Sequence, residues 1–276
     1  IHLPIMVSDI PNHDGLDSMY FDQNMITSGR WFLTIACGFS SYFTIPWLIG
    51  LLGMVYLGVA AAALTELLEL KDKLVIGLVS GLLVAFPALA STFAYVYTLD
   101  GYMMALALAI LAVLFTKKCK RGFLWGAVCL ALSMGVYQAY LPFAILLCIY
   151  SIVILLIEGG TWKQQLKSAL HYLYMGVLGV GIYYVMLQIL LKIQGKELDT
   201  YQGISGMSGQ GARPGLVATL VDLYKDFLAF TLKGNVLWNN IFSVGAFVVL
   251  ALLAVITMAI LILRRKWWKK LGFFAI

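Results

Sequence analysis

The chain has 276 residues, of which 62% are hydrophobic and only 12% are charged. Soluble domains carry about a quarter charged residues, so the composition excludes a water-soluble globular protein and predicts an all-α, polytopic transmembrane protein. The net charge of +6 is explained by basic loops beside a lipid bilayer, and no nucleic-acid partner is expected. The four cysteines show no CxxC spacing and no His-rich metal pattern, so we interpret them as small apolar fillers.

Seven apolar stretches approach the length of about 20 residues that a helix needs to cross a bilayer. They cover residues 44–65, 74–96, 101–116, 122–138, 141–158, 171–191 and 238–263. The third and fourth are short, and we expect them to extend into their interfacial flanks. The chain begins at Ile1 in an apolar run and stops after a basic cluster. We therefore expect an internal segment of a longer protein, with 1–276 forming a single transmembrane domain.

The loops between these stretches alternate in charge. Thirteen of the 19 Lys and Arg residues fall in alternate loops, and nine of the 13 acidic residues fall in the others. The positive-inside rule assigns the basic loops to the cytoplasm. Residues 1–43 then form a first outer loop with juxtamembrane helices, and residues 194–237 form a large outer loop. The basic residues are Lys71 and Lys73; Lys117, Lys118, Lys120 and Arg121; Lys163 and Lys167; and Arg264, Arg265, Lys266, Lys269 and Lys270.

The large outer loop contains the glycine-rich run GISGMSGQGARPG at 203–215. This run lacks the Lys-Ser/Thr pair of a phosphate-binding P-loop, so it is either a flexible surface loop or a mobile lid over a substrate. After Pro214, the spacing of Leu216, Leu220, Leu223 and Phe227 predicts an amphipathic helix on the outer surface.

The first outer loop holds the candidate acid–base residues. Asp14 and Asp17 are spaced i, i+3 and share one face if Asp14 begins a helix. Asp14 could serve only as a helix cap, and the chemical and capping interpretations both stand. Asp9 and Asp22 are interpreted as solvated loop charges.

Four other polar residues fall on the same predicted outer face. Asp100 and Tyr102 open a span, where an Asp can cap the helix and a Tyr can belong to an interface belt. Tyr137 and Gln138 lie in a tight turn between two spans. Tyr137 can be an ordinary residue of the interface belt. An amide near the hydrocarbon edge needs hydrogen-bond partners, so Gln138 is the stronger candidate for a functional residue.

Two arginines, Arg30 and Arg213, complete the set. Arg30 can extend its charge from the interface to water, or it can bind phosphate oxygens in a bidentate fashion. Carboxylates, arginines and aromatic rings on one lipid-facing side suit transfer of a group from a lipid phosphate to a hydroxyl acceptor. A carboxylate would act as general base and an arginine would stabilise the departing phosphate.

Three segments carry a resemblance to a known family. HDGLDSMYFDQNMITSGRWF, FPALASTFAYVYTLDGYMMALAL and LSMGVYQAYLPFAI resemble, in this order, segments of the Gtr-type bacterial membrane glucosyltransferases, which have a GT-C-like fold. The similarity covers roughly residues 10–150, and the later spans match mainly in hydropathy.

The resemblance implies a polyprenyl-phosphate sugar donor, typically undecaprenyl-phosphate glucose, and an extracytoplasmic cell-envelope glycan such as O-antigen as acceptor. It places the enzyme in the bacterial cytoplasmic membrane with its active site outside. Asp14 corresponds to the catalytic base and Asp17 to a supporting carboxylate, with the order between them open because Gly15 and Leu16 separate them. Asp100 and Tyr102 match the family's Asp-x-Tyr opening of a span.

The resemblance further matches Gln138 to a Tyr-Gln pair and implies inversion at the anomeric carbon. No cofactor is assigned, and participation of a divalent metal is left open. The alternatives are a transporter or flippase of lipid-linked glycans, a glycan polymerase, and an acyltransferase using His13. Scarce charges within the spans argue against transport, and a single arginine in loop 194–237 argues against a polymerase.

Overall fold

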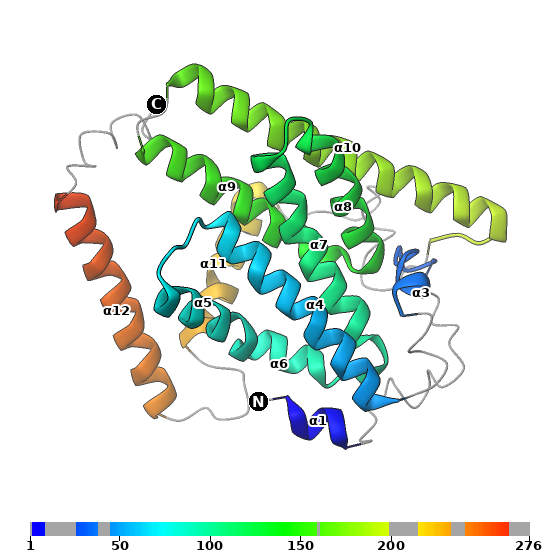
Figure 1. The fold of residues 1–276 in the computed structure, drawn as a ribbon, viewed down its shortest axis with the longest axis horizontal. Coiled ribbons are helices and arrows are strands. Elements are labelled where there is room, and N and C mark those ends of the chain that lie inside the picture. The colour runs from blue at the N-terminus through cyan, green and yellow to red at the C-terminus, as the bar shows by residue number, and fades with distance from the viewer. Residues whose placement is uncertain are drawn as a thin grey trace. The chain divides into compact units, whose positions relative to one another are not determined.

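The structure is a computed structural model that describes residues 2–8, 26–37, 45–158, 161–198, 215–232 and 241–264. All elements within these ranges are helical (Figure 1). The chain forms two compact units, residues 1–207 and 208–276. The first unit contains α1 (Leu3–Val7), α3 (Leu33–Ala36), α4 (Pro46–Leu67), α5 (Lys73–Ala85), α6 (Pro87–Phe93), η1 (Val96–Thr98), α7 (Leu99–Lys118), α8 (Gly122–Val136), η2 (Gln138–Tyr140), α9 (Leu141–Ile157) and α10 (Trp162–Gln194). The second contains α11 (Leu216–Leu232) and α12 (Ile241–Arg264).

Local sequence signals explain where several helices begin and end. Pro46 opens α4, at a position where its missing N–H costs no hydrogen bond. The Asp72 side chain caps α5 by accepting from two backbone N–H groups of the first turn. Thr161 and Gln164 form a capping box at the start of α10. Gly195 ends α10 with a left-handed φ of 62°, which glycine adopts without steric cost.

Four helical segments are long and apolar enough to cross a membrane, in the part of the chain that the structure describes. They are Pro46–Leu67, Val96–Lys118, Gln138–Leu155 and Trp162–Gln194. Three further apolar helical segments are shorter: Lys73–Ala85, Gly122–Val136 and Val248–Thr257. The all-α prediction is confirmed, and each of the seven predicted spans coincides with at least one helix. The count of seven spans and the GT-C fold remain predictions.

The predicted continuous span 74–96 is wrong. Phe86 has an extended backbone with ψ of 132°, and Pro87 starts a new helix, so the segment is divided into α5 and α6. Proline disfavours the helical conformation of the residue before it and has no N–H to continue the ladder. The carbonyl of Val84, just before the break, lies 2.9 Å from Nε2 of His2. The apolar composition concealed a division that the proline imposes.

Helix α7 is the centre of the first unit and lies between α4 and α8 (Figure 1). Its residues are buried along most of its length, from Leu99 to Thr116. Small residues allow this close packing, as they do between membrane helices generally. A cross-link is added by the Ser133 hydroxyl of α8, which donates to the Ala105 carbonyl of α7 at 2.8 Å.

Helices α7 and α8 approach closely at Gly126. A Cβ at this position would stand 2.5 Å from the Ala112 carbonyl oxygen and would also overlap the Thr116 hydroxyl. The Thr116 hydroxyl donates to the same carbonyl at 2.8 Å, so the polar groups under Gly126 satisfy each other. Gly126 therefore lets two helix backbones meet without an unpaired polar group.

Helix α10 packs along α8 in the same direction. The ring of Phe123, at the start of α8, stacks on that of His171 in α10, with centroids 5.8 Å apart. Further along, a Cβ at Gly179 would lie 2.9 Å from the Leu130 side chain. Helix α8 thus lies between α7 on one side and α10 on another, and α10 ends near the same end of the unit as α8.

Helices α4 and α7 also run in the same direction. Gly53 of α4 lies against Leu99 at the start of α7, and Glu66 near the end of α4 pairs with Lys118 at the end of α7. Helix α8 runs back antiparallel to α7 after a short turn, so α8 ends where α7 begins. We call the end of the unit where α4 and α7 end the Lys117 end. The Tyr102 end is the opposite one, where α7 begins and α8 ends.

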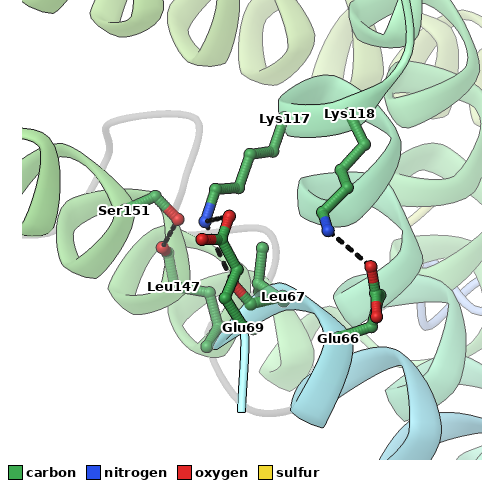
Figure 2. A network of polar contacts seen from close by, with 7 residues as sticks. All are labelled: Glu66, Leu67, Glu69, Lys117, Lys118, Leu147 and Ser151. Carbon is green, nitrogen blue, oxygen red and sulfur yellow. Dashed lines mark hydrogen bonds and ion pairs between the residues drawn. The ribbon is translucent and has the colours of Figure 1, made fainter. Parts of the chain in front are cut away.

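Ion pairs join α4 to α7 at the Lys117 end (Figure 2). Lys117 Nζ lies 2.9 Å from a Glu69 carboxylate oxygen and donates to the Leu67 carbonyl at 3.1 Å, while Lys118 pairs with Glu66. Cations near helix C-termini interact favourably with the exposed carbonyls. Lys117 and Lys118 are therefore partly neutralised by Glu66 of α4 and by Glu69, which follows the end of that helix.

Glu69 adopts an unusual backbone conformation, with φ of 57°. The Glu69 N–H donates to the Glu66 carbonyl and the Leu70 N–H donates to the Thr65 carbonyl, which is the Schellman pattern that usually has glycine at this position. The hydrogen bond and charge of Lys117 hold the pKa of Glu69 below its usual value. The ion pair therefore favours the charged form of Glu69 in the folded protein.

Replacing Gly126 by Ala is expected to destabilise the protein by about 1–3 kcal/mol, because the added methyl group overpacks a backbone contact. Gly181→Ala on α10 is the matched control, since nothing lies within 4 Å of a Cβ there. Thermal unfolding in detergent checks the difference. Equal melting temperatures for the two variants would contradict the close approach of α7 and α8.

Replacing Glu69 by Gln is expected to lower the melting temperature at pH 7 by removing the ion pair with Lys117. A depressed carboxyl pKa contributes stability above the unfolded-state pKa of about 4.3, and this contribution is lost as pH falls through the folded-state pKa. The difference between wild type and variant should therefore shrink below about pH 4. Glu158→Gln, at the end of α9, is the control. A difference independent of pH would exclude the ion pair as its cause.

Candidate substrate-binding site

The structure places five of the eight predicted site residues. Asp14, Asp17 and Arg213 lie outside the described residues. The other five all lie at the Tyr102 end of the first unit: Arg30 before α3, Asp100 and Tyr102 in the first turn of α7, and Tyr137 and Gln138 after α8. Residues that are up to about a hundred positions apart in the sequence thus gather where α7 begins and α8 ends.

The segment carrying Arg30 is fastened to the end of α8. The Phe32 N–H donates to the Gly135 carbonyl at 2.8 Å. A Cβ at Gly135 would lie 2.8 Å from the Trp31 ring and 2.9 Å from Phe32, so a glycine is needed for the segment to come this close. After Gly135, Tyr137 turns to an extended backbone and projects from the end of α8 beside Arg30.

Arg30 is surrounded by aromatic rings. Its guanidinium carbon lies 4.9 Å from the centroid of the Tyr137 ring, a cation–π distance. Its Nη1 donates to the Tyr102 hydroxyl at 3.5 Å, the outer limit of a hydrogen bond. The rings of Tyr102 and Tyr137 stack with centroids 5.0 Å apart, and Tyr140 meets Tyr137 edge-on. We call Arg30, Tyr102, Tyr137 and Tyr140 the Arg30 cluster.

The charge of Arg30 is left uncompensated within the described part of the chain. No carboxylate in that part forms an ion pair with it, and its Nε is buried without a hydrogen-bond partner in the structure. Buried N–H donors are normally paired, and a guanidinium presents its donors in a fork that matches phosphate oxygens. The cluster is therefore suited to an anionic ligand.

A second polar network lies beside the cluster and contains a residue that the sequence analysis missed. Gln138 Nε2 donates to the Ser28 carbonyl at 3.2 Å and to the Tyr183 hydroxyl at 2.9 Å. The Tyr183 hydroxyl donates in turn to the Gly29 carbonyl at 3.0 Å. The missed residue is Tyr183 of α10. A tyrosine hydroxyl within a long apolar run needs a hydrogen-bond partner, and this was the signal that could have identified it from the sequence. Gln138 has the hydrogen-bond partners that its position predicts.

Asp100 is more enclosed than the other site residues. It is 2% exposed, and its carboxylate accepts the Gly101 N–H at 2.9 Å. A carboxylate in the first turn of a helix interacts favourably with the helix dipole. The N-cap of α7 is Thr98 and no side chain caps this helix, so Asp100 is not its capping residue. The predicted role of Asp100 in substrate binding remains a prediction. Among the described residues, no group of three His, Cys, Asp or Glu residues could hold a metal ion.

The apolar helices are those of a helical membrane protein, and the cationic, aromatic Arg30 cluster lies at one end of its first unit. The family model described as Glucosyl transferase GtrII matches residues 3–276. The chain belongs to this family and is a glucosyltransferase, which confirms the resemblance seen in the sequence. Comparisons with curated proteins and with solved structures find no significant match.

Proposed function

We propose that the enzyme transfers glucose from a polyprenyl-phosphate carrier to an extracytoplasmic cell-envelope glycan. The observation that carries this proposal is the buried, unpartnered Nε of Arg30 beside stacked tyrosine rings. A glucosyltransferase needs a donor with an anionic leaving group, and a phosphate attached to the sugar supplies one. Aromatic rings give the apolar surface on which a sugar face or the first lipid unit can pack.

Arg30 binds the donor phosphate in this proposal. Its Nε and an Nη can each donate to one phosphate oxygen in a bidentate pair. The phosphate carries one negative charge while glucose is attached and gains a second as the sugar leaves. A fixed cation therefore stabilises the transition state more than the bound donor, which accelerates the reaction.

The first outer loop supplies the general base. Asp14 and Asp17 precede Arg30 by 16 and 13 residues, and an extended chain of this length spans about 40 Å or more. A chain of this length is long enough for either carboxylate to reach a donor bound at Arg30. Asp14 is the preferred base and Asp17 its support.

The reaction balances with these groups. The carboxylate removes the proton of the acceptor hydroxyl, and the hydroxyl oxygen forms a bond to the anomeric carbon of glucose. The bond between that carbon and the phosphate oxygen breaks, and its electron pair leaves with polyprenyl phosphate. Direct displacement inverts the anomeric carbon.

The donor or its sugar contacts five further residues in this proposal: Asp100, Tyr102, Tyr137, Gln138 and Arg213. Gln138 offers its amide oxygen, because its nitrogen already donates to Ser28 and Tyr183.

The distribution of charge supports an outer location for the Arg30 cluster. Lys117, Lys118, Lys120 and Arg121 lie at the opposite end of the unit, and the positive-inside rule assigns that end to the cytoplasm. A carrier lipid in the outer leaflet would then present its phosphate at the depth of the Arg30 cluster. Glu66 and Glu69, near the Lys117 end, are committed to their lysine partners.

Replacing Arg30 by Lys is expected to reduce donor-dependent glucosyl transfer roughly 10- to 100-fold, because a lysine ammonium cannot form the bidentate pair. Membranes containing the variant are incubated with radiolabelled undecaprenyl-phosphate glucose and cell-envelope glycan. Arg121→Lys, at the opposite end of the unit, is the matched control and should keep wild-type activity. Full activity in Arg30→Lys would remove Arg30 from the site.

Replacing Asp14 by Asn is expected to abolish transfer while membrane insertion persists, because the amide cannot accept the acceptor's proton. Asp17→Asn should retain partial activity, and Asp9→Asn is the control that should retain all of it. A fully active Asp14→Asn variant would exclude Asp14 as the base. If wild-type membranes label no acceptor with any polyprenyl-phosphate sugar, the proposed donor class is wrong.

A further inference from the structure

Tyr183 of α10 holds the backbone that carries Arg30. Its hydroxyl donates to the Gly29 carbonyl at 3.0 Å and accepts from Gln138 Nε2 at 2.9 Å. Gln138 uses the same nitrogen to donate to the Ser28 carbonyl at 3.2 Å. The two peptide carbonyls before Arg30 are thus held from two directions, by η2 and by α10.

The chemistry of the network leaves one assignment of donors and acceptors. A peptide carbonyl only accepts, so the Gln138 group facing Ser28 must be the NH2. Its second hydrogen then points to the Tyr183 oxygen, and the single Tyr183 hydrogen goes to Gly29. Each hydrogen of the Gln138 NH2 and of the Tyr183 hydroxyl therefore has one acceptor. Losing the Tyr183 hydroxyl would leave the Gly29 carbonyl without this partner.

The turn at Gly29 fits closely against both side chains. Gly29 has φ of 80°, and its N–H donates to the Ile26 carbonyl at 3.0 Å. A Cβ there would lie 2.5 Å from Gln138 Nε2 and 2.6 Å from the Tyr183 hydroxyl. Glycine is favoured at position 29 for two reasons: a positive φ disfavours a side chain, and the neighbouring Gln138 and Tyr183 leave no room for one. The turn is therefore placed directly on the Tyr183–Gln138 pair.

We propose that Tyr183 is a positioning residue for the donor phosphate: it fixes the Ser28–Gly29 backbone so that the Arg30 guanidinium stands over the Tyr137 ring. This inference rests on the proposed role of Arg30 in donor binding. A guanidinium that must meet two phosphate oxygens tolerates little displacement, since small errors in position cost much of the benefit. Helix α10, which contains no predicted site residue, thereby sets the geometry of the site.

The test uses Tyr183→Phe, which removes one oxygen atom and retains the ring that packs beside Trp31 and Leu187. Tyr184→Phe is the matched control, because this neighbouring tyrosine is 57% exposed. Glucosyl transfer from labelled undecaprenyl-phosphate glucose is measured as kcat/KM, and undecaprenyl phosphate is tested as a product inhibitor. Both variants are also made in the Arg30→Lys background.

Tyr183→Phe is expected to lower kcat/KM about 3- to 15-fold, as for the loss of one hydrogen bond. It should also weaken inhibition by undecaprenyl phosphate, because donor and product share the phosphate that Arg30 binds. In the Arg30→Lys background the second substitution should have less than about a twofold effect, since residues that act through one another are not additive. Tyr184→Phe should match wild type in both backgrounds.

Two results would overturn the inference while leaving the proposed function intact. One is a loss of activity in Arg30→Lys with no loss in Tyr183→Phe. The other is a Tyr183→Phe effect that is equally large in both backgrounds, which would make Tyr183 a structural residue only. If Arg30→Lys itself keeps full activity, the proposed donor site fails, and the positioning role of Tyr183 fails with it.

Discussion

The close packing of α7 against α8 is the constraint on which the first unit depends. Gly126 lies against the backbone of α7, and the Ser133 hydroxyl bonds across the interface to Ala105. Lipid tails give helices no hydrophobic reason to associate, so such small-residue contacts and hydrogen bonds hold them together. Because this packing fixes both helices, the start of α7 meets the end of α8 in a set register, and Tyr102 stacks on Tyr137.

The two ends of this unit differ in how their positive charges are compensated. At the Lys117 end, Lys118 pairs with Glu66 of α4 and Lys117 pairs with Glu69 just after α4. Exposed pairs of this kind contribute little beyond joining two segments. At the Tyr102 end, Arg30 is flanked by tyrosine rings, and its buried Nε has no hydrogen-bond partner among the residues that the structure describes. We propose that this cation binds an external anion, and the family's glucosyl transfer supplies a reason for one.

Sequence reasoning succeeded where a property belongs to a short window of residues. Arg30, Tyr102 and Tyr137 were grouped because polar residues at span ends share a membrane face, and the structure brings them into contact. It failed at Phe86–Pro87, where average hydropathy outweighed the helix-breaking proline. It also passed over Tyr183, because a tyrosine in an apolar span resembles an ordinary interface residue until its hydroxyl partner is known.

The sequence by itself determined the membrane character, the helical class and the alternation of charge. These follow from composition and from the fixed thickness of a bilayer, which act on each segment separately. Only the tertiary structure decided that the Gln138 nitrogen is engaged by Ser28 and Tyr183, and that Asp100 is enclosed at the start of α7. Such contacts depend on distances of closest approach between helices, which small residues such as Gly126 set and no single segment encodes.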